Sequence, residues 1–90
     1  MLVALIARDQ AGALQTRMDN RPAHVDYLKA SGKTVFQAGP LIDGGNMAGS
    51  LIILDVADMA EAEAWAAGDP YARAGLFASV EMIEWKKVIG

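Results

Sequence analysis

The sequence predicts an α+β protein of ferredoxin-like βαββαβ order, in which a four-stranded antiparallel sheet carries both helices on one face. Four apolar runs alternate with two helical segments in that order. A glycine-rich turn joins the second and third runs into a hairpin. With strands numbered along the chain, the expected spatial order is 4-1-3-2. The 90 residues are expected to form a single domain, residues 1–90.

The first strand and the first helix are predicted from an apolar run and a capping pattern. Residues 2–7 are apolar throughout, and the length of the run favours a buried strand. A helix is predicted over about residues 21–31, with Asn20 as its N-cap and Pro22 in its first turn. On this prediction His24, the only histidine, stands close to a helix N-terminus. It is therefore a candidate for proton transfer near neutral pH.

The central hairpin is predicted from two apolar runs around a turn. Residues 34–38 form the second strand, and Gly39 and Pro40 are expected to stop or bend it, because proline cannot donate to a ladder. Residues 43–46, Asp-Gly-Gly-Asn, are a strong turn signal, and residues 50–56 form the third strand.

Two capping signals define the second half of the chain. Asp58 with Glu61 three residues later is a capping box that opens an alanine-rich helix. Asp69 is placed to cap a further short helical turn with Pro70 at its first position. Residues 77–88 form the last strand.

Composition excludes several classes of function. The net charge is −3, and the eight basic residues are scattered, so nucleic acid is not an expected partner. The absence of cysteine and the single histidine argue against a metal site, and no cofactor is expected. The N-terminal apolar run is too short to span a membrane and lacks the basic leader of a signal peptide. A cytoplasmic protein is expected.

The strand pattern also predicts a homodimer. An antiparallel sheet with one wet face should alternate apolar and polar residues. Residues 51–54 and residues 2–7 do not alternate, and 53% of all residues are hydrophobic. The chain has no spare helix for the second face of the sheet, so a second copy of the sheet is expected to cover it.

The predicted topology brings distant residues to one edge of the sheet. His24, the segment Gly39–Pro40, Ser50 and Asp69 all reach the same end, and Arg8 at the end of the first strand joins them. A histidine with a carboxylate at a shared edge is a stronger site candidate than a histidine elsewhere.

The motifs at this edge occur in an order that resembles the YCII-related (YciI-like) proteins, over essentially the whole chain. They are Arg17, Arg21-Pro22-Ala23-His24, Gly39-Pro40-Leu41, Gly49-Ser50, Asp69-Pro70-Tyr71 and Gly75. The resemblance implies a ferredoxin-like fold in a dimeric α/β barrel, akin to small dimeric isomerases, lyases and monooxygenases. It also implies a His–Asp active-site pair, which corresponds to His24 and Asp69. A dehydrochlorinase acting on a chlorinated hydroxyquinol is among the activities associated with the family.

A His–Asp pair predicts general acid/base chemistry, because the carboxylate orients the imidazole and stabilises its charged form. No nucleophile is evident, so a small-molecule enzyme of lyase or isomerase type, working by proton abstraction, fits better than acyl transfer. The remaining candidates would surround the substrate. Ser50 and Tyr71 would hydrogen-bond it, Arg8 and Arg17 would bind an anionic group, and Gly39 and Pro40 would shape the pocket wall.

Several alternatives stay open at this stage. Asp69 also fits a purely structural role as a helix cap, and His24 also fits a solvated helix residue. Strand-edge position and helix packing explain Ser50 and Tyr71 equally well, and Arg8 and Arg17 also fit ordinary surface charge. The whole chain also fits a non-catalytic dimeric module that binds a metabolite or serves as an accessory domain.

Overall fold

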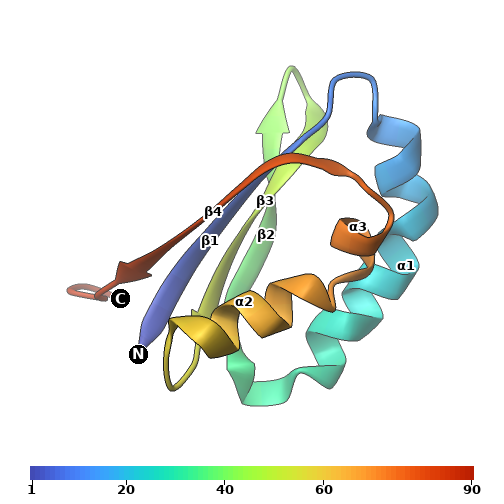
Figure 1. Ribbon diagram of the computed structural model, residues 1–90. Coiled ribbons are helices and arrows are strands. Elements are labelled where there is room, and N and C mark those ends of the chain that lie inside the picture. The colour runs from blue at the N-terminus through green and yellow to red at the C-terminus, as the bar shows by residue number, and fades with distance from the viewer.

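The computed structural model describes residues 1–90 and has the predicted fold class. Its elements are β1 (Leu2–Asp9), α1 (Leu14–Ala30), the 3₁₀ turn η1 (Gly32–Thr34), β2 (Val35–Asp43), β3 (Asn46–Asp55), α2 (Met59–Ala67), α3 (Pro70–Arg73) and β4 (Phe77–Trp85). The strands form one antiparallel sheet in the order β2-β3-β1-β4. The helices lie together on one side of this sheet (Figure 1). The predicted order 4-1-3-2 is therefore confirmed.

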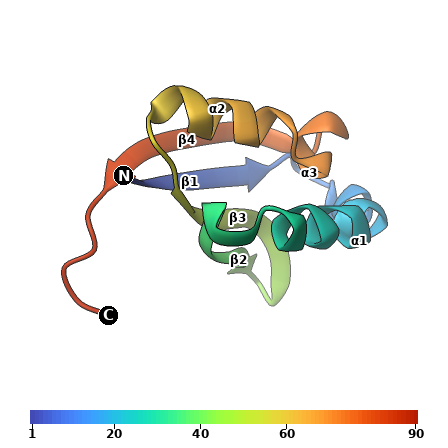
Figure 2. The ribbon, with the colours of Figure 1, turned by 90° about the horizontal axis from the view of Figure 1, so that it is seen from below.

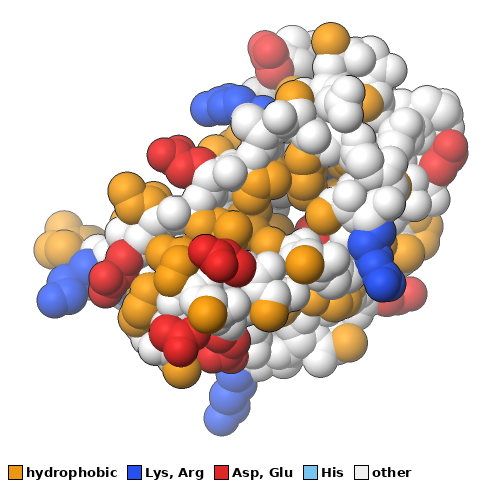
Figure 3. Space-filling view, viewed as in Figure 1, with side chains coloured by type: hydrophobic (Ala, Val, Ile, Leu, Met, Phe, Trp, Pro, Cys, Tyr) orange, Lys and Arg blue, Asp and Glu red, His pale blue; other side chains and the backbone are white.

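The core lies between the sheet and the helices. Alternate residues of β1, namely Val3, Leu5 and Ala7, point toward the helices and are buried. Trp65 of α2 packs against this cluster, and its indole N–H donates to the Ser31 hydroxyl at 2.8 Å. Hydrophobic side chains gather in the hollow between α2 and β4, and acidic side chains lie on the outer surface of α2 (Figure 3).

The other face of the sheet carries no helix and is apolar. Leu51, Ile83 and Trp85 are 41%, 54% and 38% exposed in the isolated chain. Their register partners on β1 are Ile6, Ala4 and Leu2, so the exposed side chains form one continuous patch across three strands. The termini lie together at one end of this sheet, where residues after β4 leave the body of the domain (Figure 2).

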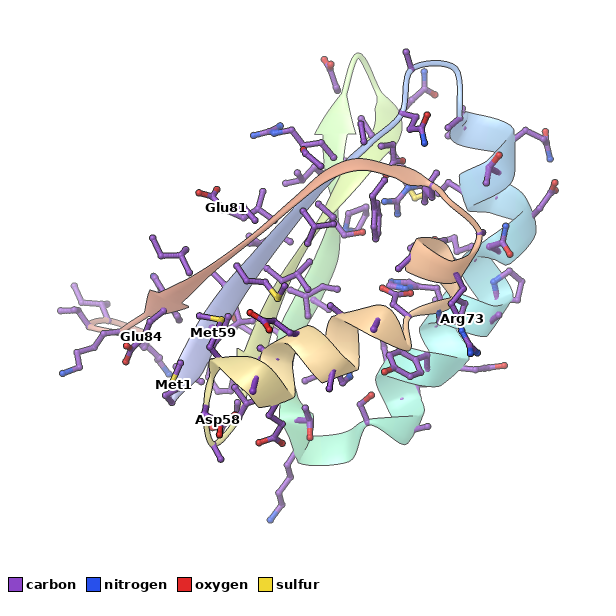
Figure 4. All side chains as sticks on the ribbon, viewed as in Figure 1. Met1, Asp58, Met59, Arg73, Glu81 and Glu84 are labelled. Carbon is purple, nitrogen blue, oxygen red and sulfur yellow. The ribbon has the colours of Figure 1, made fainter.

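The edge strand β4 carries charged side chains among its apolar ones. Glu81 and Glu84 project into solvent from this strand (Figure 4). Charged side chains on an edge strand disfavour pairing with another strand. Glu81, opposite Ile6 in the register, lies on the helix-free face at the border of the apolar patch.

The prediction for the first helix is wrong at its start. α1 begins at Leu14, seven residues before the predicted start, and its first turn has no side-chain cap. Asn20 lies inside the helix, where its amide donates to the carbonyl oxygen of Thr16 at 2.8 Å. Pro22 also lies inside, although proline removes a helical hydrogen bond there. His24 is consequently near the middle of α1 and far from a helix N-terminus.

The predicted strand boundaries also need correction. β2 continues through Gly39 and Pro40 to Asp43, with Pro40 opposite Ser50 of β3. Proline is tolerated there because β2 is an edge strand and one side of it needs no donor. β3 begins at Asn46, before the predicted position, and β4 ends at Trp85, three residues earlier than predicted.

One glycine, Gly49, allows β1 and β3 to approach each other closely. A Cβ added at Gly49 would overlap the carbonyl oxygen of Ala7 on the neighbouring strand. Gly49 therefore lets β1 and β3 pair closely, and the next residue, Ser50, is held with its side chain on the helical side of the sheet.

Candidate active site

A small cavity lies between α1, α3 and the β2-β3 hairpin. Its volume is about 120 Å³. The lining residues are Arg17, Arg21, His24, Val25, Leu28, Ala38, Gly39, Pro40, Met47, Ser50, Ile52 and Tyr71. Polar groups therefore come mainly from α1 and α3, and apolar groups from the hairpin and α1. α3 lies directly beside α1 in the fold (Figure 1).

His24 and Asp69 form a buried pair on this cavity wall. The imidazole Nδ1 lies 2.8 Å from Asp69 Oδ1, and the two side chains are 8% and 3% exposed. The same Oδ1 atom accepts a hydrogen bond from the backbone N–H of Tyr71 at 2.9 Å. Asp69 is therefore the N-cap of α3 and the partner of His24 at the same time. The structural and functional readings of this aspartate are compatible.

The ring of Tyr71 holds the imidazole from the side. The two rings are stacked, with centroids 3.9 Å apart and planes 17° from parallel. The guanidinium carbon of Arg17 lies over the same phenol ring, 4.4 Å from its centroid. Two flat groups cannot occupy the same face of one ring at these distances, so Tyr71 lies between Arg17 and His24. Stacking and cation–π attraction thus fix the orientation of all three groups.

Arg17 is itself held by a bidentate ion pair. Its Nε and Nη2 donate to the two carboxylate oxygens of Asp9 at 2.7 and 3.0 Å, and Nη2 also donates to the Ser50 hydroxyl at 2.9 Å. Burial alone would lower the pKa of Arg17, but the hydrogen bonds and negative charge of Asp9 raise it above its ordinary value. The positive charge of Arg17 is therefore neutralised by Asp9, and most of its N–H donors are already hydrogen-bonded. Its guanidinium supports the ring of Tyr71.

One polar atom at the cavity has no partner in the protein. Every fully buried side-chain nitrogen or oxygen is hydrogen-bonded, whereas His24 Nε2 has no partner and therefore contacts open space at the cavity. The Tyr71 hydroxyl, which also belongs to the cavity lining, lies beside the Arg17 guanidinium. Since Nδ1 is engaged by Asp69, Nε2 is the imidazole atom that a ligand can reach.

Tyr71 is a neutral phenol at physiological pH. Burial is the largest cause that raises the pKa of Tyr71 above its ordinary value, and the nearby charge of Asp69 adds to the rise. The positive charges of Arg17 and Arg21 act in the opposite direction without reversing the outcome. The hydroxyl therefore keeps its proton and is able to donate a hydrogen bond into the cavity.

The structure brings most of the predicted site residues together, but not Arg8. Arg8 follows buried Ala7 on β1, so its side chain points to the helix-free face, where it lines a separate shallow hollow with Ile6 and Leu51. Sequence reasoning missed two groups. Asp9 holds Arg17, and Arg21 lines the cavity. The spacing of Arg17, Arg21 and His24 at i, i+4 and i+7 is the signal for a shared helical face that would have found Arg21.

The whole-chain arrangement matches a known family. The model of the YCII-related domain matches residues 1–86. The chain belongs to the YCII-related family. Protein YciI of Escherichia coli O6:H1 (strain CFT073) is 34% identical over 98 residues, covering 98% of this chain and 99% of the relative.

Solved structures of similar fold include one of a named enzyme. The 5-chloro-2-hydroxyhydroquinone dehydrochlorinase TftG from Burkholderia phenoliruptrix AC1100, solved in complex with 2,5-dihydroxybenzoquinone, is 33% identical with a TM-score of 0.88. The similarity covers 96% of this chain and 94% of TftG. A dimeric ferredoxin-like protein of unknown function from Jannaschia sp. CCS1 shares the fold at 21% identity and a TM-score of 0.53, covering 93% of this chain and 98% of that one. The ferredoxin-like fold of dimeric α+β barrels is thus shown.

Two further features of this YCII-related chain concern metals and membranes. No group of three or more His, Cys, Asp or Glu side chains is placed to hold a metal ion. No helix has both the length and the apolar character needed to cross a membrane.

The raised pKa of Tyr71 predicts a pH-dependent loss of stability. Above about pH 10 the unfolded chain releases the phenol proton, whereas the folded chain retains it. The contribution of Tyr71 to the free energy of unfolding should therefore be complete below that pH and fall as the pH rises through the folded pKa. In Tyr71→Phe this part of the fall should disappear, as measured by urea denaturation at about pH 8 and about pH 11.

Tyr27→Phe is the comparison variant for this measurement. Burial raises the pKa of Tyr27 as well, so this variant should also lose part of the alkaline fall. The Tyr27 hydroxyl donates to the carbonyl oxygen of Trp65 at 2.7 Å, so Tyr27→Phe should also lose about 1 kcal/mol of the free energy of unfolding at neutral pH. An alkaline fall that is as large in Tyr71→Phe as in the parent would contradict the assignment.

Proposed function

We propose that this YCII-related chain is a small-molecule enzyme in which His24 performs general acid/base catalysis. The observation that carries the proposal is the buried His24–Asp69 pair, whose one unengaged nitrogen, Nε2, opens into the cavity. Such a pair, placed in a cleft, meets the geometric requirement for a general base with an orienting partner.

The carboxylate of Asp69 determines which nitrogen of His24 reacts. An ionised carboxylate accepts but does not donate, so Nδ1 carries the proton in the contact with Oδ1 and Nε2 presents its lone pair to the cavity. When Nε2 takes a proton from a substrate, Asp69 stabilises the resulting imidazolium. Proton transfer by a positioned side chain contributes roughly 10²- to 10⁴-fold in rate.

The reaction class supported best is proton abstraction followed by loss or shift of a group. The named activity of TftG, dehydrochlorination, is of this type, because it releases a proton and a chloride ion. The two chains share 33% identity over almost their full lengths. The cavity, at about 120 Å³, is close in size to a cavity of about 150 Å³ that binds benzene, so a substrate with a single ring fits its volume.

Paired variants test the proposal. His24→Gln should lower the rate of chloride release from 5-chloro-2-hydroxyhydroquinone by roughly 10²-fold or more, with little change in the affinity for 2,5-dihydroxybenzoquinone. Asp69→Asn should lower the rate as well, because asparagine can still cap α3 but carries no charge to stabilise imidazolium. Glu63→Gln, the same change at an exposed position of α2, is the control and should leave the rate unchanged.

Two outcomes would contradict the proposal. A parental rate in His24→Gln would show that the imidazole does not transfer the proton. Binding of 2,5-dihydroxybenzoquinone without any chloride release by the parent would favour the non-catalytic metabolite-binding module instead.

We also propose that the chain works as a homodimer built through the helix-free face of the sheet. The support is the continuous apolar patch around Leu51, Ile83 and Trp85, together with the similarity in fold to a dimeric ferredoxin-like protein. Monomeric proteins rarely leave such a patch in water. The cavity lies on the other side of the sheet, so a dimer of this kind leaves its mouth open.

Sedimentation velocity tests the dimer. The parent should sediment as a dimer at micromolar concentration, and Leu51→Asp should shift it toward the monomer, because a charge would then be buried in the interface. Glu63→Gln, at an exposed position of α2 on the helical side of the sheet, should remain dimeric. A stable parental monomer at that concentration would exclude this assembly.

A further inference from the structure

Arg21 occupies a special position on the cavity wall. It lies one helical turn from Arg17 and one turn from His24, and all three side chains line the cavity. Unlike the other two, Arg21 is exposed and stands where the cavity opens to the surface.

The charge of Arg21 has no partner within the protein. The ion pairs of the chain involve the N-terminus, Arg17 and His24, and no carboxylate oxygen lies within 4.0 Å of the Arg21 guanidinium. Asp26 lines the adjoining surface hollow with Arg21 but forms no ion pair with it. The positive charge of Arg17, by contrast, is offset by the two oxygens of Asp9.

Arg21 nevertheless acts on the interior of the site. Arg21 and Tyr71 line the same cavity, and the positive charge of Arg21 lowers the pKa of Tyr71 against the rise caused by burial. The Tyr71 hydroxyl accepts from Arg17 and keeps its own proton for donation. An unpaired cation and a neutral donor therefore face the same space.

The apolar part of the cavity lining comes mainly from the β2-β3 hairpin. Pro40, Met47 and Ile52 contribute to it, together with Leu28 of α1. A flat ring of about the size of benzene fits a volume of about 120 Å³ against such a wall. The site therefore combines an apolar slot with a polar edge formed by Arg21, Tyr71 and His24.

Resting on the proposed function, we propose that the site selects a single-ring substrate that carries an ionised oxygen on the ring, and that Arg21 is the residue that selects it. The oxyanion binds the guanidinium of Arg21, and a neighbouring O–H or C–H faces Nε2 of His24. In the proton-transfer step the substrate X–H bond breaks and the Nε2–H bond forms, while the electron pair stays on the ring. Arg21 then stabilises the added negative charge.

Two probes of similar size test the selection by binding alone. 2,5-Dihydroxybenzoquinone is an anion at neutral pH, and hydroquinone is a neutral ring of similar shape. In isothermal titration calorimetry the parent should bind the anion at least about 10-fold more tightly than hydroquinone. Arg21→Gln should lose most of this preference by weakening anion binding alone, and Arg21→Lys should retain part of it.

Lys29→Gln is the matched control. It removes the same charge from an exposed position of the same helix, outside the cavity, and should keep the parental preference. Equal binding of the two probes by the parent, failure of the parent to bind the anion at millimolar concentration, or an unchanged preference in Arg21→Gln would overturn the inference.

The same experiment separates this inference from the proposed function. His24→Gln should keep the preference for the anion, because the oxyanion contact belongs to Arg21. If Arg21→Gln loses the preference while His24→Gln turns substrate over normally, anion selection holds and the catalytic role of His24 fails. If His24→Gln abolishes turnover while Arg21→Gln keeps the preference, the catalytic role of His24 holds and anion selection by Arg21 fails.

Discussion

One oxygen atom, Asp69 Oδ1, connects the parts of this site. It accepts the backbone N–H that begins α3 and contacts the imidazole that projects from the middle of α1. Because α3 is only four residues long, this atom both starts the helix and ties it to α1. A hydrogen bond to a charged group typically contributes ~1.5–3 kcal/mol. Local folding and the orientation of the proposed base therefore depend on the same contact.

The other residues of the site form a stack of charged groups and aromatic rings that the sheet supports. Asp9 at the end of β1 and Ser50 on β3 hold Arg17, Arg17 supports Tyr71, and Tyr71 supports the imidazole of His24. Each layer is buried, so each interaction is stronger than it would be in water. A group locked from two sides by contacts of this kind is preorganised, and preorganisation is what a positioned general base requires.

Sequence reasoning succeeded where local patterns match the final structure and failed where distant partners decide it. The apolar runs, the Asp58 and Asp69 caps and the paired strands gave the correct topology and brought His24 to Asp69. The start of α1 was missed because Ala13 offers no capping side chain and Pro22 resembles a first-turn proline. The roles of the arginines were predicted wrongly for a different reason. Arg8 follows a buried alanine on a strand and so faces away, and only the fold reveals that Asp9 neutralises Arg17 and leaves Arg21 unpaired.

We propose that Asp69 holds the proton of His24 on Nδ1 and leaves Nε2 as the reactive nitrogen. Long-range ¹H–¹⁵N NMR of the neutral imidazole tests it directly, and the single histidine gives one unambiguous set of signals. We expect a predominant Nδ1–H tautomer in the parent, with an Nε2 signal typical of an unprotonated nitrogen. A predominant Nε2–H tautomer would contradict the proposed role of His24, because Nδ1 would then accept a hydrogen bond from a protonated Asp69 and no base would face the cavity.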